Sequence, residues 1–208
     1  MCKAKLMIKI ALAIALLSFA SCSSKTNAEK APAQSANLVQ AEANEPLYTL
    51  AEKHGFKMGA VISAESVTRA NYTNMVKADF NSITASNEFK AYSLASQQLS
   101  IKSENGMPVM NYTKADSIAK FAQENGIGIR GHVLVWDAYM PDWFFRQGFS
   151  RENDFVDRKT MCARLQYYIE EVINHFETNF PGVVYCWDVV NEAVADGTNE
   201  CKADDPRH

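Results

Sequence analysis

The sequence predicts an α/β fold, in which helices cover a sheet of parallel strands. Four short apolar segments have the length and composition of buried strands, and three amphipathic segments with helical periodicity alternate with them. The chain has 208 residues, of which 47% are hydrophobic and 22% charged, and these values exclude a disordered or multi-span membrane protein. The formal net charge is −3 and Lys and Arg do not cluster, so no nucleic-acid partner is expected.

The first three elements lie between residues 56 and 84. Residues 56–62 form an apolar run suited to a buried strand, and a second strand is expected over residues 81–84. Between them, residues 67–80 have the periodicity of a helix. The expected apolar face of this helix consists of Val67, Met75, Val76 and Phe80.

The second helix is expected over residues 112–125 and has explicit boundary signals. Thr113 and Asp116 have the spacing of a capping box at its start, and Gly126 supplies its stop. Its apolar face consists of Ile118, Phe121 and Ala122. A third strand is then expected over residues 127–136.

The last helix and strand complete the alternation. Residues 157–180 have helical spacing and end at Pro181-Gly182, and residues 183–190 form a fourth strand. The expected apolar face of the helix consists of Met161, Leu165, Ile169, Val172, Ile173 and Phe176. Strands that alternate with helices in this way form a parallel sheet, whose functional residues lie at the carboxyl ends of the strands.

Polar and aromatic residues lie at these strand ends in the sequence. They are Glu88 and Lys90 after the second strand, His132 and Trp136 toward the end of the third, and Asn191 and Glu192 after the fourth. Glu192 directly follows an apolar run, and we expect partial desolvation to disfavour its charged form and to suit it to donate a proton. A solvated or salt-bridged glutamate in a loop is the alternative for Glu192 taken alone.

Three separate segments resemble one enzyme family. Residues 187–193 (Trp-Asp-Val-Val-Asn-Glu-Ala) are similar to the acid/base strand of family 10 glycoside hydrolases, the endo-1,4-β-xylanase family. Residues 81–90 are similar to the second-strand segment of that family, and residues 130–136 with 141–144 to its third strand and following loop. The matches occur in the family's order, and the resemblance covers residues 47–208.

The resemblance implies a (β/α)₈ TIM barrel, of which this chain holds the first four β/α units. It also implies retaining hydrolysis of internal β-1,4 bonds in xylan, with Glu192 as the general acid/base and without a metal ion or cofactor. Asn191 would bind the 2-hydroxyl of the sugar at the cleavage point. The other substrate-binding residues implied are Asn87, Glu88, Lys90, His132 and Trp136.

The chain departs from the family pattern near two of these motifs. Asp137 stands where the family usually has His, and Ala138, Tyr139 and Met140 replace its usual polar run. Ser86 and Ala91 replace Glu and Trp around the second-strand motif. These differences leave open the preference between xylan and related β-1,4-linked polysaccharides.

Retaining hydrolysis needs a second carboxylate, and the family has its nucleophile near the end of strand seven. A full barrel takes about 250 residues, so we expect this chain to be an N-terminal fragment that carries the acid/base, lacks the nucleophile and does not hydrolyse xylan alone. Two alternatives are another retaining β-1,4-glycanase of the same clan and a lipoprotein that binds polysaccharide without cutting it. Residues 87–90 favour the xylanase.

The first 46 residues have the composition of targeting and linker segments. Lys3, Lys5 and Lys9 precede an apolar run that ends at small residues before Cys22, which predicts a lipoprotein signal peptide over residues 1–21 and lipidation of Cys22. An ordinary signal peptide with an incidental Cys22 is the alternative. Residues 22–46 are expected to be a flexible tether, and the protein is expected to be exported and membrane-anchored through its lipid, facing the periplasm or the cell surface.

The expected folded part, residues 47–208, holds three cysteines, which are Cys162, Cys186 and Cys201. In an oxidising compartment at most one pair of them can form a disulfide, and the sequence does not select that pair. The alternative is that they are buried thiols that pack as small hydrophobic side chains.

Overall fold

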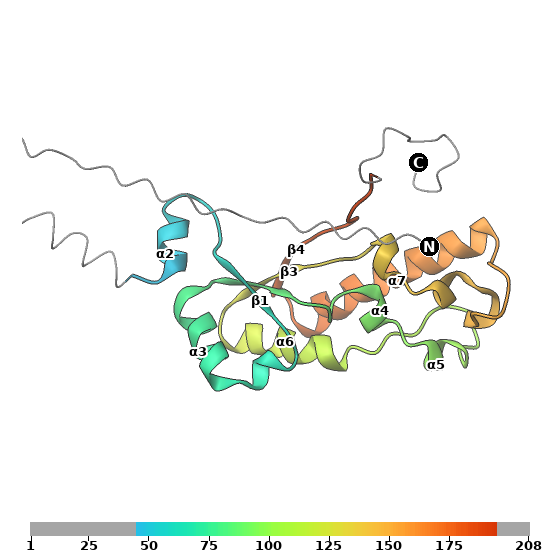
Figure 1. Ribbon diagram of the computed structural model, residues 1–208, viewed down its shortest axis with the longest axis horizontal. Helices are drawn as coiled ribbons and strands as arrows, with labels where there is room; N and C mark the ends of the chain where they lie inside the picture. The colour runs from blue at the N-terminus through green and yellow to red at the C-terminus, as the bar shows by residue number, and fades with distance from the viewer. Residues whose placement is uncertain (1–44, 195–208) are drawn as a thin grey trace, which may run out of the picture. The chain divides into compact units, whose positions relative to one another are not determined.

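The computed structural model describes residues 45–194, which form one four-stranded parallel sheet with helices between its strands (Figure 1). The strands, in the spatial order of the sheet, are β1 (Gly59–Ile62), β2 (Ser82–Ala85), β3 (Gly128–Gly131) and β4 (Val184–Trp187). The connecting helices are α3 (Ala70–Asp79), α6 (Thr113–Glu124) and α7 (Arg158–Asn179). The predicted alternation and parallel sheet are confirmed. The predicted signal peptide, Cys22, nearly all of the tether and Cys201 lie outside the described residues.

Several short elements were not predicted. They are the helices α2 (Leu47–Glu52), α4 (Ala91–Leu94) and α5 (Gln97–Ser100), and the 3₁₀ turns η1 (Ser66–Thr68), η2 (Asp137–Tyr139), η3 (Asp142–Phe145) and η4 (Gln147–Phe149). Each spans six residues or fewer, which is too short to show a helical period in the sequence. One of these turns changes a predicted boundary. The helix predicted over residues 67–80 corresponds to α3, which begins at Ala70 because η1 occupies residues 66–68.

The core lies between one face of the sheet and the helices. Ile62 at the end of β1, Ile83 in β2 and Ile129 in β3 point toward this core, and each is at most 1% exposed. The predicted apolar face of α6 is confirmed, because Ile118, Phe121 and Ala122 are all buried against the same core. Side chains alternate across a strand, so Val61, Arg130 and Tyr185 lie on the opposite face, where they are exposed.

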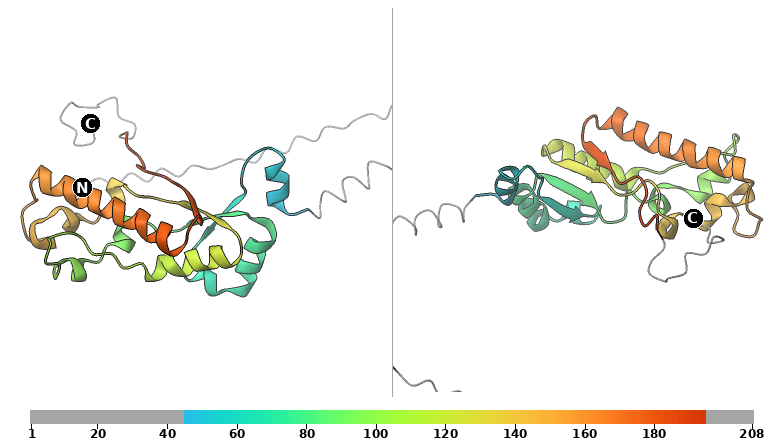
Figure 2. Two further views of the ribbon diagram at one scale, coloured as in Figure 1. Left: turned by 180° about the vertical axis from the view of Figure 1, so that it is seen from behind. Right: turned by 90° about the horizontal axis from the view of Figure 1, so that it is seen from above.

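Helix α7 lies beside β4 (Figure 2). The stripe that it buries differs from the one predicted. The fully buried positions are Arg164, Tyr168, Val172 and Phe176, at a spacing of four residues. Arg164 is tolerated there because its guanidinium donates hydrogen bonds to the carbonyl oxygens of Gly106, Phe144 and Arg146, at 2.8 to 3.2 Å. Of the predicted face only Val172 and Phe176 are fully buried, while Met161, Leu165, Ile169 and Ile173 are half-buried.

The start of α6 is capped differently from the prediction. Asn111 Oδ1 accepts hydrogen bonds from the backbone N–H and the hydroxyl of Thr113, at 3.1 and 2.7 Å. Asp116 does not close a capping box, because its carboxylate binds His175 Nε2 at 2.6 Å and so links α6 to α7. The predicted stop is confirmed, because Gly126 has a φ of +65°, which favours glycine at a helix end.

The two described cysteines contradict the alternative in which the thiols are buried. Cys162 on α7 and Cys186 on β4 are exposed, and they are not paired with one another. Within residues 45–194, no helix has the length and apolar character needed to cross a bilayer.

The backbones that follow β3 and β4 remain paired beyond the strands themselves. Leu134 N–H donates to the carbonyl oxygen of Asp188 at 3.1 Å, and Val135 forms an isolated parallel bridge with Val190. Asn191 N–H then donates to the carbonyl oxygen of Val135 at 2.9 Å. This pairing places residues 132–136 directly alongside residues 188–192 at the carboxyl end of the sheet.

Gly131, the last residue of β3, is required by the packing of β4. A Cβ atom at this position would collide with the indole ring of Trp187, which packs against Phe89 and Phe176 in the core. We expect Gly131→Ala to lower the free energy of unfolding by about 1–3 kcal/mol, as measured by urea denaturation followed by tryptophan fluorescence.

Gly59→Ala on β1 is the matched control for this measurement. A Cβ atom there would lie 3.8 Å from the atoms of Ser82, which is an ordinary contact. We therefore expect this variant to be as stable as the parent chain or slightly more stable, because alanine has less entropy to lose on folding. Equal destabilisation by the two substitutions would contradict the role given to Gly131.

Candidate active site

Glu192 and Trp136 meet at the carboxyl end of the β3–β4 pair. The Trp136 Nε1–H donates a hydrogen bond of 2.8 Å to Glu192 Oε2. The partial burial that we predicted for Glu192 is wrong for the described residues, because Glu192 is exposed and the preceding Val189 and Val190 are 58% and 55% exposed. The carboxylate is therefore held by a single directed bond at the rim of the sheet.

The backbone at Glu192 is in a conformation that glutamate rarely adopts. Its φ is +51°, in the left-handed region, which costs a residue with a side chain about 1–2 kcal/mol. Such outliers concentrate at functional sites, where the surrounding structure compels them. Here the bond between Asn191 N–H and the carbonyl oxygen of Val135 fixes the residue immediately before the outlier.

A network of charged side chains lies earlier in the same two chain segments, between Arg130, His132 and Asp188. Asp188 Oδ1 accepts hydrogen bonds from Arg130 Nε and Nη2 at 3.0 and 2.8 Å, and Asp188 Oδ2 lies 2.9 Å from His132 Nδ1. Partial burial raises the pKa of Asp188, but the hydrogen bonds from Arg130 and His132 outweigh it and hold that pKa below its usual value. The His132 ring, fixed by this bond, lies 5.7 Å from the Trp136 ring, edge to face.

Lys90 approaches the same tryptophan from the loop that follows β2. Its Nζ donates to Asn87 Oδ1 at 3.0 Å and lies 5.2 Å from the centroid of Trp136. The turn that carries these residues is anchored by Phe89, which is fully buried and stacks on Phe176 at 4.6 Å. Asn87, Lys90, His132, Trp136 and Glu192 are thus brought together at one end of the sheet.

The two remaining predicted residues are held in other ways. Glu88 is only 8% exposed, and its two carboxylate oxygens accept hydrogen bonds from the backbone N–H groups of Ala64 and Asn87, at 2.8 and 3.0 Å. It therefore joins the loop after β1 to the loop after β2. Asn191 is half-buried and is tied to Val135 through its backbone.

Sequence reasoning missed four residues that contact this cluster. Arg130 in β3 and Asp188, which directly follows β4, have opposite charges and lie within the two neighbouring strand segments that the sequence predicts, so their pairing was a usable signal. Tyr139 and Tyr92 carry no comparable signal, because they come from η2 and from α4, two short elements whose mutual position depends on the tertiary fold.

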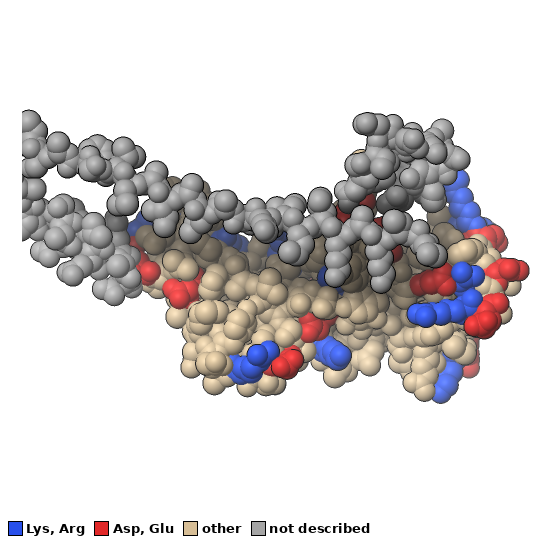
Figure 3. Space-filling view, viewed as in Figure 1, with Lys and Arg blue, Asp and Glu red and all other residues tan. Residues whose placement is uncertain are grey.

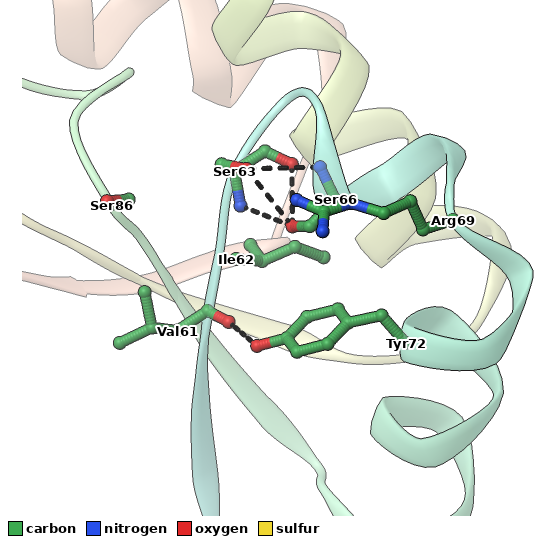
Figure 4. A pocket seen from close by; sticks show the side chains of 7 residues that line it. All are labelled: Val61, Ile62, Ser63, Ser66, Arg69, Tyr72 and Ser86. Atoms are coloured by element: carbon green, nitrogen blue, oxygen red, sulfur yellow. Dashed lines mark hydrogen bonds between the residues drawn. The ribbon is translucent and has the colours of Figure 1, made fainter.

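A small hollow lies at the carboxyl end of β1, lined by residues that include Ser63, Arg69 and Ser86 (Figure 4). Its polar groups already have partners in the chain, since Ser63 and Ser66 bond to one another and the Tyr72 hydroxyl donates to the carbonyl oxygen of Val61. On the face shown in Figure 3, acidic and basic side chains are intermixed. In the described part of the chain, no group of three or more His, Cys, Asp or Glu side chains is placed to hold a metal ion.

The network around Asp188 predicts a pH-dependent contribution to stability. Because the pKa of Asp188 is lower in the folded chain than its usual value of about 3.9, its ionised form stabilises the fold above that pH, and this contribution is lost as the pH falls through the folded-state pKa. We expect Asp188→Asn to lower the free energy of unfolding by about 1–2 kcal/mol at pH 7 and by less at pH 3. Urea denaturation at the two pH values measures this, with the exposed Asp154→Asn as control, and an equal loss at both would contradict it.

The chain is similar in sequence to known xylanases. Residues 46–205 match the family described as Glycosyl hydrolase family 10. The chain is 37% identical over 145 residues to endo-1,4-beta-xylanase B of Butyrivibrio fibrisolvens, covering 68% of this chain and 23% of that protein. It is 50% identical over 94 residues to a putative endo-1,4-beta-xylanase of Caldicellulosiruptor saccharolyticus, covering 45% of this chain and 30% of that protein. The chain thus spans less than a third of the length of these two relatives.

Solved structures show the same relationship. The N-terminal endo-1,4-beta-D-xylanase 10B of Clostridium thermocellum, solved with xylohexaose, superposes with a TM-score of 0.63 at 33% identity, covering 68% of this chain and 27% of that one. A psychrophilic family 10 endo-beta-1,4-xylanase superposes with a TM-score of 0.61 at 31% identity, covering 78% and 44%. The described strands and helices are successive β/α units of the (β/α)₈ barrel that this family shares. The chain belongs to glycosyl hydrolase family 10.

Proposed function

We propose that the protein is an endo-1,4-β-xylanase, which hydrolyses internal β-1,4-xylosidic bonds of xylan with retention of configuration. The observation that carries this proposal is the Glu192 carboxylate at the rim of the sheet, hydrogen-bonded at 2.8 Å to the indole of Trp136, whose ring is also approached by Lys90 and His132. The relatives whose names specify endo-1,4-beta-xylanase activity support the choice of xylan as substrate.

Glu192 would act as the proton donor and then as the base. Its carboxyl group gives a proton to the glycosidic oxygen while a second carboxylate attacks the anomeric carbon, so that the C–O bond breaks and a glycosyl-enzyme ester forms. Glu192, now ionised, accepts a proton from a water molecule as the oxygen of that water bonds to the anomeric carbon. The bond from this carbon to the second carboxylate then breaks and the sugar is released. The bond from Trp136 keeps the carboxyl group in one orientation through both steps.

The second carboxylate must lie about 5–5.5 Å from the first. Among the described residues, two acidic groups that we placed at this end of the sheet are already engaged, since Asp188 binds Arg130 and His132, and Glu88 binds two backbone N–H groups. We infer that the nucleophile belongs to a part of the enzyme outside this sequence. The small share of the relatives' length that this chain covers supports that inference.

Substrate binding would use the other members of the cluster. The flat indole face of Trp136 suits the apolar face of a xylose ring, and the ammonium of Lys90 with the amide of Asn87 suits its hydroxyl groups. His132, fixed by Asp188, would contact the sugar at the cleavage point. Asn191 would bind its 2-hydroxyl, beside the carboxylate that protonates the bond.

The role of Glu192 is tested with Glu192→Gln in the full-length gene product. We expect hydrolysis of xylan to fall by about 10²–10⁴-fold, because glutamine accepts the bond from Trp136 but has no proton to give. The leaving group of a dinitrophenyl xylobioside departs without protonation. We therefore expect the rate of the first step with this substrate, measured by the burst of dinitrophenolate, to fall much less than the rate of xylan hydrolysis.

The exposed Glu124 of α6 provides the matched control, because Glu124→Gln makes the same chemical change on the outer surface. This variant is expected to hydrolyse both substrates at the parental rate. If Glu192→Gln cleaved long xylan chains as fast as the parent protein, Glu192 would not be the proton donor.

We also propose that the protein is exported as a lipoprotein, with a signal peptide over residues 1–21, a lipid on Cys22 and a tether over residues 22–46. The basic start, the short apolar run and the small residues before Cys22 support this. A bacterial host supplied with radiolabelled palmitate is expected to label the parent protein and Cys162→Ser, but not Cys22→Ser. Label on Cys22→Ser equal to that on the parent would contradict lipidation at this residue.

A further inference from the structure

The ammonium group of Lys90 has an unusual environment for a positive charge. Lys90 is only 8% exposed, and within residues 45–194 it forms no ion pair. Glu88, two residues earlier, forms no ion pair with Lys90, and its two carboxylate oxygens accept hydrogen bonds from backbone N–H groups instead. One of the three ammonium N–H groups donates to Asn87 Oδ1, so the charge needs further stabilisation from its surroundings.

Aromatic rings supply that stabilisation. Lys90 Nζ lies 4.3 Å from the centroid of Tyr139 and 5.2 Å from that of Trp136, and both distances are within the range of a cation–π interaction. Tyr139 is the nearer ring. An ammonium removed from water gains more from such a contact than an exposed one.

Tyr139 also connects the two loops of the candidate site. It lies in η2, which directly follows Trp136, and its ring packs on the Trp136 ring, with the centroids 4.3 Å apart and the planes tilted by 45°. Lys90 comes from the loop after β2. Contacts therefore run without a break from Asn87 through Lys90, Tyr139 and Trp136 to Glu192.

We propose that Tyr139 is a positioning residue, whose ring holds the Lys90 ammonium in place so that its remaining N–H groups bind hydroxyls of the sugar chain. This inference rests on the proposed function, because it assigns Tyr139 to the same substrate site. Tyr139 acts through Lys90, and its effect on substrate binding should therefore depend on the positive charge at residue 90.

The test is a double-mutant cycle on the affinity for xylohexaose, measured by isothermal titration calorimetry. The full-length gene product carries Glu192→Gln throughout, so that the oligosaccharide is not hydrolysed. Tyr139→Leu is measured with Lys90 intact and again with Lys90→Met, which keeps the length of the side chain and removes the charge. Tyr139→Gln is a second variant without the ring and replaces Tyr139→Leu in the cycle if the leucine variant does not fold.

We expect Tyr139→Leu to raise Kd about tenfold with Lys90 intact and less than twofold in the Lys90→Met background. Tyr139→Phe keeps the ring and should restore most of the affinity that the leucine variant loses. Tyr92→Leu is the matched control. Tyr92 lies in helix α4, and its ring centroid is 5.5 Å from that of Tyr139. Its substitution should weaken the affinity for xylohexaose less than Tyr139→Leu does.

An equal loss in both backgrounds would overturn the proposal, since Tyr139 would then act on the sugar or the loop independently of Lys90. An unchanged Kd for Tyr139→Leu would overturn it as well. Failure of the parent protein to bind xylohexaose is a different result, because it contradicts the proposed function itself and the role of Tyr139 falls with it.

Discussion

The parallel pairing of residues 132–136 with residues 188–191 is the constraint on which the site depends. Hydrogen bonds from Asp188 N–H to the carbonyl oxygen of Gly131 and from Asn191 N–H to that of Val135, both 2.9 Å, fix the register. In this register Trp136 reaches Glu192 and His132 reaches Asp188. A slip of one residue would turn each side chain to the other face of the sheet and separate both pairs.

The order of strands and long helices could be predicted from the sequence, because each of these elements carries its own periodicity. The apolar face of α6 and the stop at Gly126 were predicted correctly for the same local reason. The buried stripe of α7 was not, because Arg164 is acceptable in the core only when the carbonyl oxygens of distant loops accept its hydrogen bonds. The role of Asp116 likewise depends on a partner on another helix, His175.

The candidate site was predicted in part. Five predicted residues gather at one end of the sheet, since the carboxyl ends of neighbouring parallel strands meet there whatever the details of the loops. The partners that fix them were harder to predict. Glu88 binds backbone N–H groups and Tyr139 covers Lys90 only because the loops after β1, β2 and β3 fold against one another, and no spacing along the chain encodes that arrangement.

The central claim is that Glu192 protonates a glycosidic bond held across the Trp136 and Lys90 cluster. The most direct measurement is a crystal structure of the full-length gene product, carrying Glu192→Gln, with xylohexaose bound. We expect a glycosidic oxygen about 3 Å from the side-chain amide of residue 192 and a sugar hydroxyl bonded to Lys90 Nζ. An oligosaccharide bound elsewhere, such as in the hollow beside Ser63 and Arg69, with residue 192 free of contact, would contradict it.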